Sequence, residues 1–160
     1  MTDDALEKSA DLLVEGLWAR LRDILMAQAR WDGFVHDPEG GRPADESPPP
    51  PEDAGRLAAE VILRALRVAV DPVNHAILCR LAREEVVALP TLTETTGLNR
   101  VVLVETVSDL AQVGLASYAA GTSEVSSSAG GRGLVGLLDE VSGRLAQTLE
   151  ERWIDLAHEV

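Results

Sequence analysis

The side chains that most often carry chemistry are few in this chain and lie far apart. The three histidines, His36, His75 and His158, fall in separate segments, and the single cysteine, Cys79, has no second thiol for a disulfide or a thiolate cluster. A zinc site needs three or four such ligands close together. We therefore expect no metal centre and no bound cofactor, and Cys79 is most simply a small core residue.

Two further patterns could carry chemistry. The segment "GGRG" at 130–133 lacks the lysine and the spacing of a nucleotide-binding loop, so it predicts the N-terminal turn of a helix. Asp155 and His158 stand one helical turn apart and could meet their counterparts at a dimer seam, although a solvated helix end explains them more simply. The sequence shows no nucleophile, general base and orienting residue at spacings that would bring them together in a catalytic site. We therefore do not expect the chain to be an enzyme.

The charge of the chain excludes several partners. Its 160 residues carry a net charge of −13, whereas proteins that neutralise phosphates normally present a basic face. This argues against non-specific nucleic-acid binding and against anionic membranes. The acidic N-terminus, MTDDALEKSAD, does not resemble a secretory or transit peptide, and no apolar run is long enough to span a membrane. We expect a soluble, cytoplasmic protein.

Apolar residues recur at spacings of three, four and seven in residues 4–31 and again in 134–157, which predicts a long amphipathic helix at each end. Their apolar stripes exceed what one small domain can cover, so we expect a homodimer. The expected dimerisation residues are Leu13, Leu17, Trp18, Leu21, Leu145, Leu149 and Trp153. The intervening segment 33–56 is rich in Gly, Pro and acid, and predicts a solvated linker.

The middle of the chain predicts short helices and a small hairpin. In chain order, the expected elements are helices over 55–70 and 71–84, a strand over 86–89, helices over 90–96 and 99–112, and two strands on either side of a tip at 121–123. Gly97 is expected to close the 90–96 helix in the left-handed conformation that a sharp helix–helix turn requires.

This order resembles the winged helix-turn-helix of the ArsR/MarR class of bacterial transcription regulators. The resemblance covers residues 57–133 and rests on "DPVNHAILCRL", on "LPTLTETTGL" and on the Gly114-Leu115 pair before the hairpin. It implies a mainly α fold with a small β-hairpin wing and long dimerisation helices at both ends. The implied divisions are an N-terminal dimerisation helix (1–32), the linker (33–56), the winged domain (57–133) and a C-terminal dimerisation helix (134–160).

The resemblance makes residues 99–112 the recognition helix, with Leu103, Val107 and Leu110 turned into the core. The groove-facing residues are then Asn99, Arg100, Val101, Val102, Val104, Glu105 and Ser108. The wing contributes Gly121, Thr122, Ser123 and, just beyond it, Arg132. Members that bind DNA usually place hydrogen-bond donors at these positions, because base edges and phosphates need them. Valine cannot donate, and phosphate repels Glu105.

The sequence therefore favours a dimeric winged-helix protein that acts mainly through protein contacts of this helix, with weak or no DNA readout, because exposed valines form the kind of apolar patch that marks contact sites. The alternative is an ordinary dimeric repressor whose polar contacts come from Asn99, Arg100, Ser108 and Arg132. A third possibility, suggested by charge alone, is an acidic mimic of DNA. A different packing of the domain would bury the valines. Related regulators bind small effectors between their long helices, but the sequence indicates no ligand.

Overall fold

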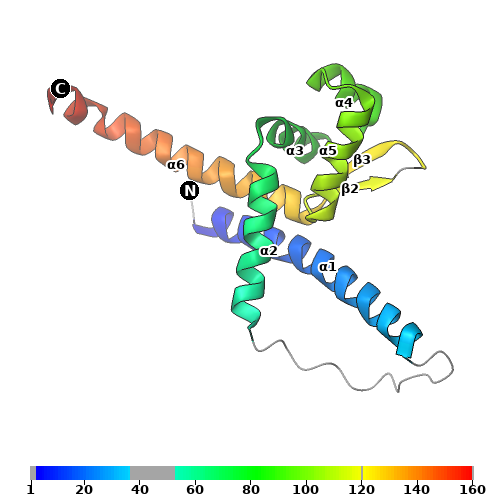
Figure 1. The fold of residues 1–160 in the computed structure, drawn as a ribbon. Helices are drawn as coiled ribbons and strands as arrows, with labels where there is room; N and C mark the ends of the chain where they lie inside the picture. The colour runs from blue at the N-terminus through cyan, green and yellow to red at the C-terminus, as the bar shows by residue number, and fades with distance from the viewer. Residues whose placement is uncertain (1–2, 37–52, 120, 160) are drawn as a thin grey trace.

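The computed structural model describes residues 3–36, 53–119 and 121–159, and the side-chain surroundings within 4–27, 53–119 and 121–152. The chain is mainly helical and includes a small antiparallel sheet (Figure 1). The described elements are α1 (Asp3–His36), α2 (Ala54–Ala69), α3 (Pro72–Glu84), β1 (Val86–Ala88), α4 (Leu89–Thr96), α5 (Arg100–Gln112), β2 (Ala116–Ala119), β3 (Glu124–Ser127) and α6 (Ala129–Glu159). Within these ranges, no helix is both long and apolar enough to cross a membrane.

A glycine seam joins α1 to α6. Gly130, Gly133 and Gly136 stand three residues apart on one face of α6, and they lie against Gly16, Leu13 and Ser9 of α1 respectively. Because rising numbers on α6 meet falling numbers on α1, the two helices run antiparallel. A Cβ atom on Gly136 would come within 2.6 Å of the Ser9 hydroxyl oxygen. Side chains larger than hydrogen are therefore excluded where the backbones approach.

The start of α6 differs from the sequence prediction, which began this helix at residue 134. The helix starts at Ala129, so the "GGRG" segment lies inside its first two turns. Ser128 caps the helix, because its hydroxyl oxygen accepts a hydrogen bond from the Gly131 amide (2.9 Å) and donates one to the Gly114 carbonyl (2.7 Å). The expectation that this segment forms the N-terminal turn of a helix is therefore confirmed, and its glycines also pack against α1.

The core of the described residues lies among α3, α4, α5, the sheet and the first turns of α6, and α1 and α2 contribute Leu17, Ala65 and Ala69 to it. Leu103, Val107 and Leu110 are fully buried, which confirms the core face expected for this helix. The other fully buried side chains are Ile77, Leu78, Leu81, Leu89, Leu92, Leu115, Val125 and Leu134. These apolar residues fix how α5 is rotated and so decide which of its residues face solvent.

Local signals set the ends of the short helices. Asp71 caps α3 by accepting hydrogen bonds from the amides of Val73 (2.9 Å) and Asn74 (3.1 Å), and Pro72 follows at the first helical position. Gly97 ends α4 with a φ of +69°, which confirms the expected left-handed conformation. Asn99 was predicted as part of the next helix, but it is the cap of α5.

Replacement of Gly97 by alanine should lower the free energy of unfolding by about 1 kcal/mol, because a Cβ atom disfavours positive φ. A Cβ here would meet no neighbour within 4 Å, so the backbone conformation alone sets the cost. Urea denaturation of the wild type, Gly97→Ala and Gly97→Asn measures it. Asparagine tolerates this conformation and should lose less than alanine. Equal losses for both variants would contradict this explanation.

The sheet has the strand order β1-β3-β2, with both pairings antiparallel. Val87 of β1 and Tyr118 of β2 lie opposite Val125 of β3, whose side chain is fully buried. The expected hairpin of β2 and β3 is therefore present. The segment predicted as a strand over 86–89 adds a third strand, β1, to the sheet. This sheet packs on α3 and on α5, which ties the hairpin to the helices.

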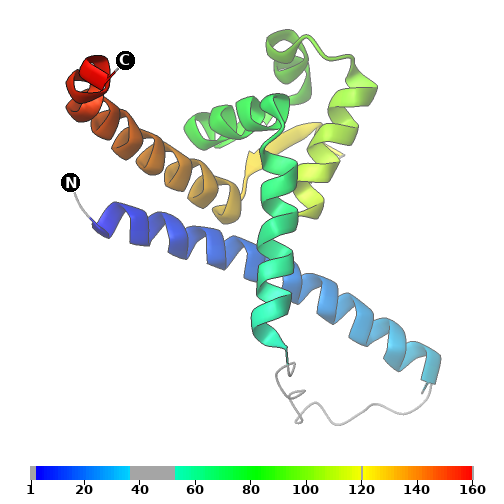
Figure 2. The same ribbon diagram turned by 60° about the vertical axis from the view of Figure 1, so that its left-hand side comes forward.

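The two long helices continue past the core in opposite directions. Figure 2 shows the C-terminal half of α1 and the C-terminal half of α6 leaving opposite ends of the seam, as does Figure 1. Every residue of 141–152 on α6 is exposed. The helices also take in both ends of the predicted linker, since residues 33–36 belong to α1 and 54–56 to α2. The rest of the linker, 37–52, lies outside the described residues.

Some residues expected at a dimer seam serve the chain's own core instead. Leu17 is 5% exposed and belongs to the core, and Leu13 packs against it beside α6. Their side of α1 is therefore used within the chain. Trp18, Leu145 and Leu149 are exposed, Leu21 is half-buried, and the side chain of Trp153 lies outside the described region.

Candidate functional site

The exposed side of α5 presents two valines between charged residues. Val101 is 69% exposed and Val102 39% exposed, and the side chains of Arg100, Glu105 and Asp109 are exposed beside them. We call these five residues the α5 surface. Asp109 was not among the predicted site residues, although it lies one helical turn beyond Glu105 on the same side.

Two predicted surface residues prove to be half-buried. Val104 packs against the core, because it follows Leu103 by one residue and lies at the edge of the buried face. Ser108 is one turn further along, and its hydroxyl donates a hydrogen bond to the Val104 carbonyl oxygen (2.7 Å). The apolar patch is thus made by Val101 and Val102, without Val104.

The charges around this surface are mainly negative. Between Val86 and Ser127 the charged residues are Glu94, Arg100, Glu105, Asp109 and Glu124, and all five are exposed. The exposed charges of α4, α5 and the hairpin are thus four carboxylates and one guanidinium. Since the DNA backbone carries a negative charge every ~1.7 Å of its axis, this distribution opposes approach of a duplex to α5.

Among the described residues, several polar side chains expected to contact DNA, although not Arg100, hold intramolecular hydrogen bonds. The Asn99 side-chain oxygen accepts from the Val102 amide (3.0 Å), and Arg132 donates through Nη1 to the Ser127 carbonyl (3.1 Å). In the hairpin, the Thr122 hydroxyl donates to the Ala119 carbonyl (3.2 Å), between exposed Gly121 and half-buried Ser123. The Thr122 hydroxyl and the Nη1 group of Arg132 would have to give up these bonds in order to contact bases.

Arg132 also lies away from α5, on the first turns of α6. There it lines a shallow cavity of about 260 Å³ together with Cys79, Arg83 and Asp139. The sequence placed this arginine next to the wing because it follows the hairpin closely. The helix starts so soon after β3 that the side chain belongs to the α3–α6 side of the molecule instead.

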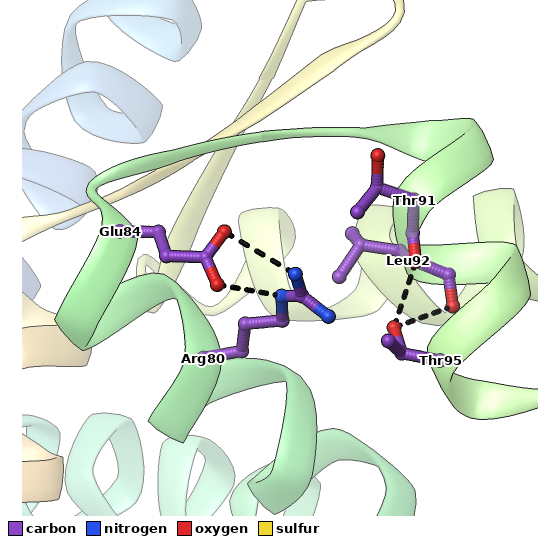
Figure 3. Close-up of polar contacts among 5 residues, drawn as sticks. All are labelled: Arg80, Glu84, Thr91, Leu92 and Thr95. Atoms are coloured by element: carbon purple, nitrogen blue, oxygen red, sulfur yellow. Dashed lines mark hydrogen bonds and ion pairs between the residues drawn. The ribbon is translucent and has the colours of Figure 1, made fainter.

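Several polar side chains of α3 and α4 are likewise held by contacts within the chain. Figure 3 shows Arg80 of α3 paired with Glu84, with 3.0 Å between Nε and Oε1. On α4, the Thr95 hydroxyl donates to the Thr91 carbonyl (2.8 Å). The hydroxyls of Thr93 and Thr96 likewise donate to carbonyls one turn back in the same helix.

A groove of about 430 Å³ runs beside the α5 surface, between α5 and the α2–α3 corner. Val68, Val73, Leu98 and Val102 supply its apolar lining, and Arg67 and Asp109 are among its polar residues. Val102 therefore belongs both to the exposed patch and to the groove. An apolar side chain from a partner could enter the groove while its neighbours contact the α5 surface.

The other chemically capable groups do not form a site. The Cys79 sulfur lies 3.4 Å from Nε2 of His75 on the same helix. Burial raises the pKa of the Cys79 thiol above its ordinary value, and the negative charge of Asp139 acts in the same direction, against an opposing effect of Arg83. The thiol is therefore protonated at neutral pH and unreactive. Within the described residues, no three His, Cys, Asp or Glu side chains are grouped to hold a metal. The side chains of His36, Asp155 and His158 lie outside them.

Comparison with protein-family models, with curated proteins and with solved structures finds no match to this chain.

Proposed function

We propose that this chain is a dimeric protein of the winged-helix transcription-regulator kind that acts mainly through protein contacts of the α5 surface, with weak or no intrinsic DNA readout. The order α3, α4, α5, hairpin, with a left-handed Gly97 between α4 and α5, supports the winged-helix part. The exposed Trp18, Leu145 and Leu149 of the long helices support the dimer.

The observation that carries the proposal is the exposed Val101–Val102 pair in a negatively charged setting. A helix that reads DNA needs donors and positive charge, and this one has a single guanidinium, Arg100, against Glu105 and Asp109. A protein partner needs instead an apolar contact at the centre and polar groups at the rim. The surface fits a partner segment whose apolar side chain meets the valines and whose basic neighbours meet the carboxylates.

The alternative function is that of a dimeric repressor, and Arg100 favours it. This side chain is exposed in the first turn of α5, the end of a recognition helix that contacts base edges. Its predicted helpers are less suited, since Asn99, Ser108 and Arg132 each hold an intramolecular hydrogen bond. The experiment below separates the two functions.

The variant Val101→Lys/Val102→Lys should abolish the protein contact and leave the fold intact, because both side chains are exposed. Val104 is left alone because it packs against the core. Proteins captured from a lysate of the native cells by the wild type are purified and titrated against each variant. We expect the double variant to bind at least ~10-fold more weakly, because it loses two central apolar contacts that cost over ~1 kcal/mol each.

Val86→Lys is the matched control, since Val86 is 51% exposed on β1 and outside the α5 surface; it should bind like the wild type. In parallel, fluorescence anisotropy with a mixed-sequence duplex at physiological salt should give a Kd for the wild type weaker than ~100 µM, the weak end of non-specific binding. Nanomolar binding of the wild type to a specific operator, lost in the double variant with no protein partner recovered, would establish the repressor instead.

A further inference from the structure

A second apolar stripe on α1 is not covered by the rest of the described residues. Val14, Trp18, Leu21 and Leu25 follow one another at spacings of four, three and four, the pattern that packs one helix along another. Val14 is 62% exposed, Trp18 58% and Leu25 47%, while Leu21 is half-buried. The seam with α6 uses a different side of the helix, through Ser9, Leu13 and Gly16.

The stripe is centred on its helix. Helix α1 extends from Asp3 to His36, so its midpoint falls between residues 19 and 20. The midpoint of the stripe, between Trp18 and Leu21, falls at the same place. Two copies of α1 that run antiparallel and align these midpoints therefore overlap along their entire length, about 51 Å at 1.5 Å per residue. In any shifted or off-centre arrangement, part of one helix would extend beyond its partner.

We infer that this stripe is the contact with a second copy of the chain, in an antiparallel α1–α1 pair around a twofold axis at the helix midpoint. Trp18 packs against the partner's Leu21, and Val14 packs against the partner's Leu25. A twofold axis repeats each contact, so four layers of apolar side chains close the seam. The inference deepens the dimeric part of the proposed function and is independent of what the α5 surface binds.

Charges beside the stripe favour the antiparallel orientation. Glu15 and Arg22 each follow a stripe residue, Val14 and Leu21, and so flank the stripe on the same side. In the antiparallel pair, Glu15 lies beside the partner's Arg22, twice by symmetry, whereas a parallel pair would not bring them together. Within one chain, Arg22 contacts only the adjacent Asp23 among the described ion pairs, at 3.6 Å, with both side chains mostly exposed. On the other side of the stripe are apolar Leu17 and Ile24.

The full-length chain tests this directly. Sedimentation velocity at about 10 µM should show a dimer for the wild type and a monomer for Trp18→Lys/Leu21→Lys. Leu145→Lys, which changes one of the exposed leucines of α6, should remain a dimer. A wild-type monomer, or a dimer lost only in Leu145→Lys, would overturn the inference. A wild-type monomer would also refute the dimeric part of the proposed function, whereas a dimer lost only in Leu145→Lys would overturn the α1 pairing alone. Neither result affects the experiment on the α5 surface.

Disulfide trapping in a Cys79→Ser background tests the orientation. Val14→Cys/Leu25→Cys should form intermolecular disulfides, because each cysteine faces the other type on the partner, and neither single cysteine variant should cross-link. Cross-linking of each single variant would show a parallel pair and refute the arrangement. As a check that does not depend on cysteine, Glu15→Arg should raise the dimer Kd roughly 10-fold, and Glu15→Arg/Arg22→Glu should restore it to within about threefold. No rescue by the charge swap would also contradict the register.

Discussion

Replacement of Gly133 by alanine is expected to lower the free energy of unfolding by about 3 kcal/mol or more, the upper range of overpacking costs. A Cβ atom there would lie 2.6 Å from the Ser9 carbonyl oxygen and closer still to the Leu13 amide nitrogen. Both are backbone atoms of α1, which cannot rotate aside as a side chain can. Relief therefore requires the whole of α1 to move away from α6.

Gly143→Ala is the matched control on the same helix. No atom lies within 4 Å of its Cβ position, so the helix preference of alanine should raise stability by about 0.8–1 kcal/mol. Thermal denaturation at one protein concentration measures both, with the melting temperature of Gly133→Ala falling by roughly 10 °C. If both alanine variants were equally stable, α1 and α6 would not approach as closely as described.

Leu103→Ala should have an effect of similar size, a loss of about 2–5 kcal/mol, because it removes a fully buried side chain from the centre of the core. Val101→Ala, two residues earlier on α5, should change stability by no more than about 0.5 kcal/mol, since its side chain is 69% exposed. Urea denaturation gives both values. Equal losses would mean that α5 turns its valines inward, and the α5 surface would then be part of the core.

Much of the fold could be predicted from apolar spacing and turn chemistry. Leu103, Val107 and Leu110 recur at helical spacing, so their burial follows from local sequence. Gly97 was predictable for a similar reason, because the requirement for positive φ arises within the turn itself. These features depend on residues close together in the chain.

The remaining features depend on contacts between distant segments. A glycine run usually weakens a helix, so only the approach of Ser9, Leu13 and Gly16 explains why Gly133 lies inside α6. Val104 was misplaced because its packing against the core, which involves residues distant in the chain, decides how far the buried face of α5 extends. The division of α1 into a side that faces α6 and an uncovered stripe was likewise hidden, since both sides contain leucines.

The glycine seam also bears on synthesis and folding. Gly16 and Gly130 are more than a hundred positions apart, so α1 is translated long before the segment it packs against. At ~5–20 residues per second, the nascent α1 waits roughly 6–23 s for the start of α6 to be made, with both of its apolar sides exposed. Closing so large a loop also places the seam among the slow, non-local steps of folding. A chaperone that shields apolar helices on the ribosome would therefore act on α1 during this interval.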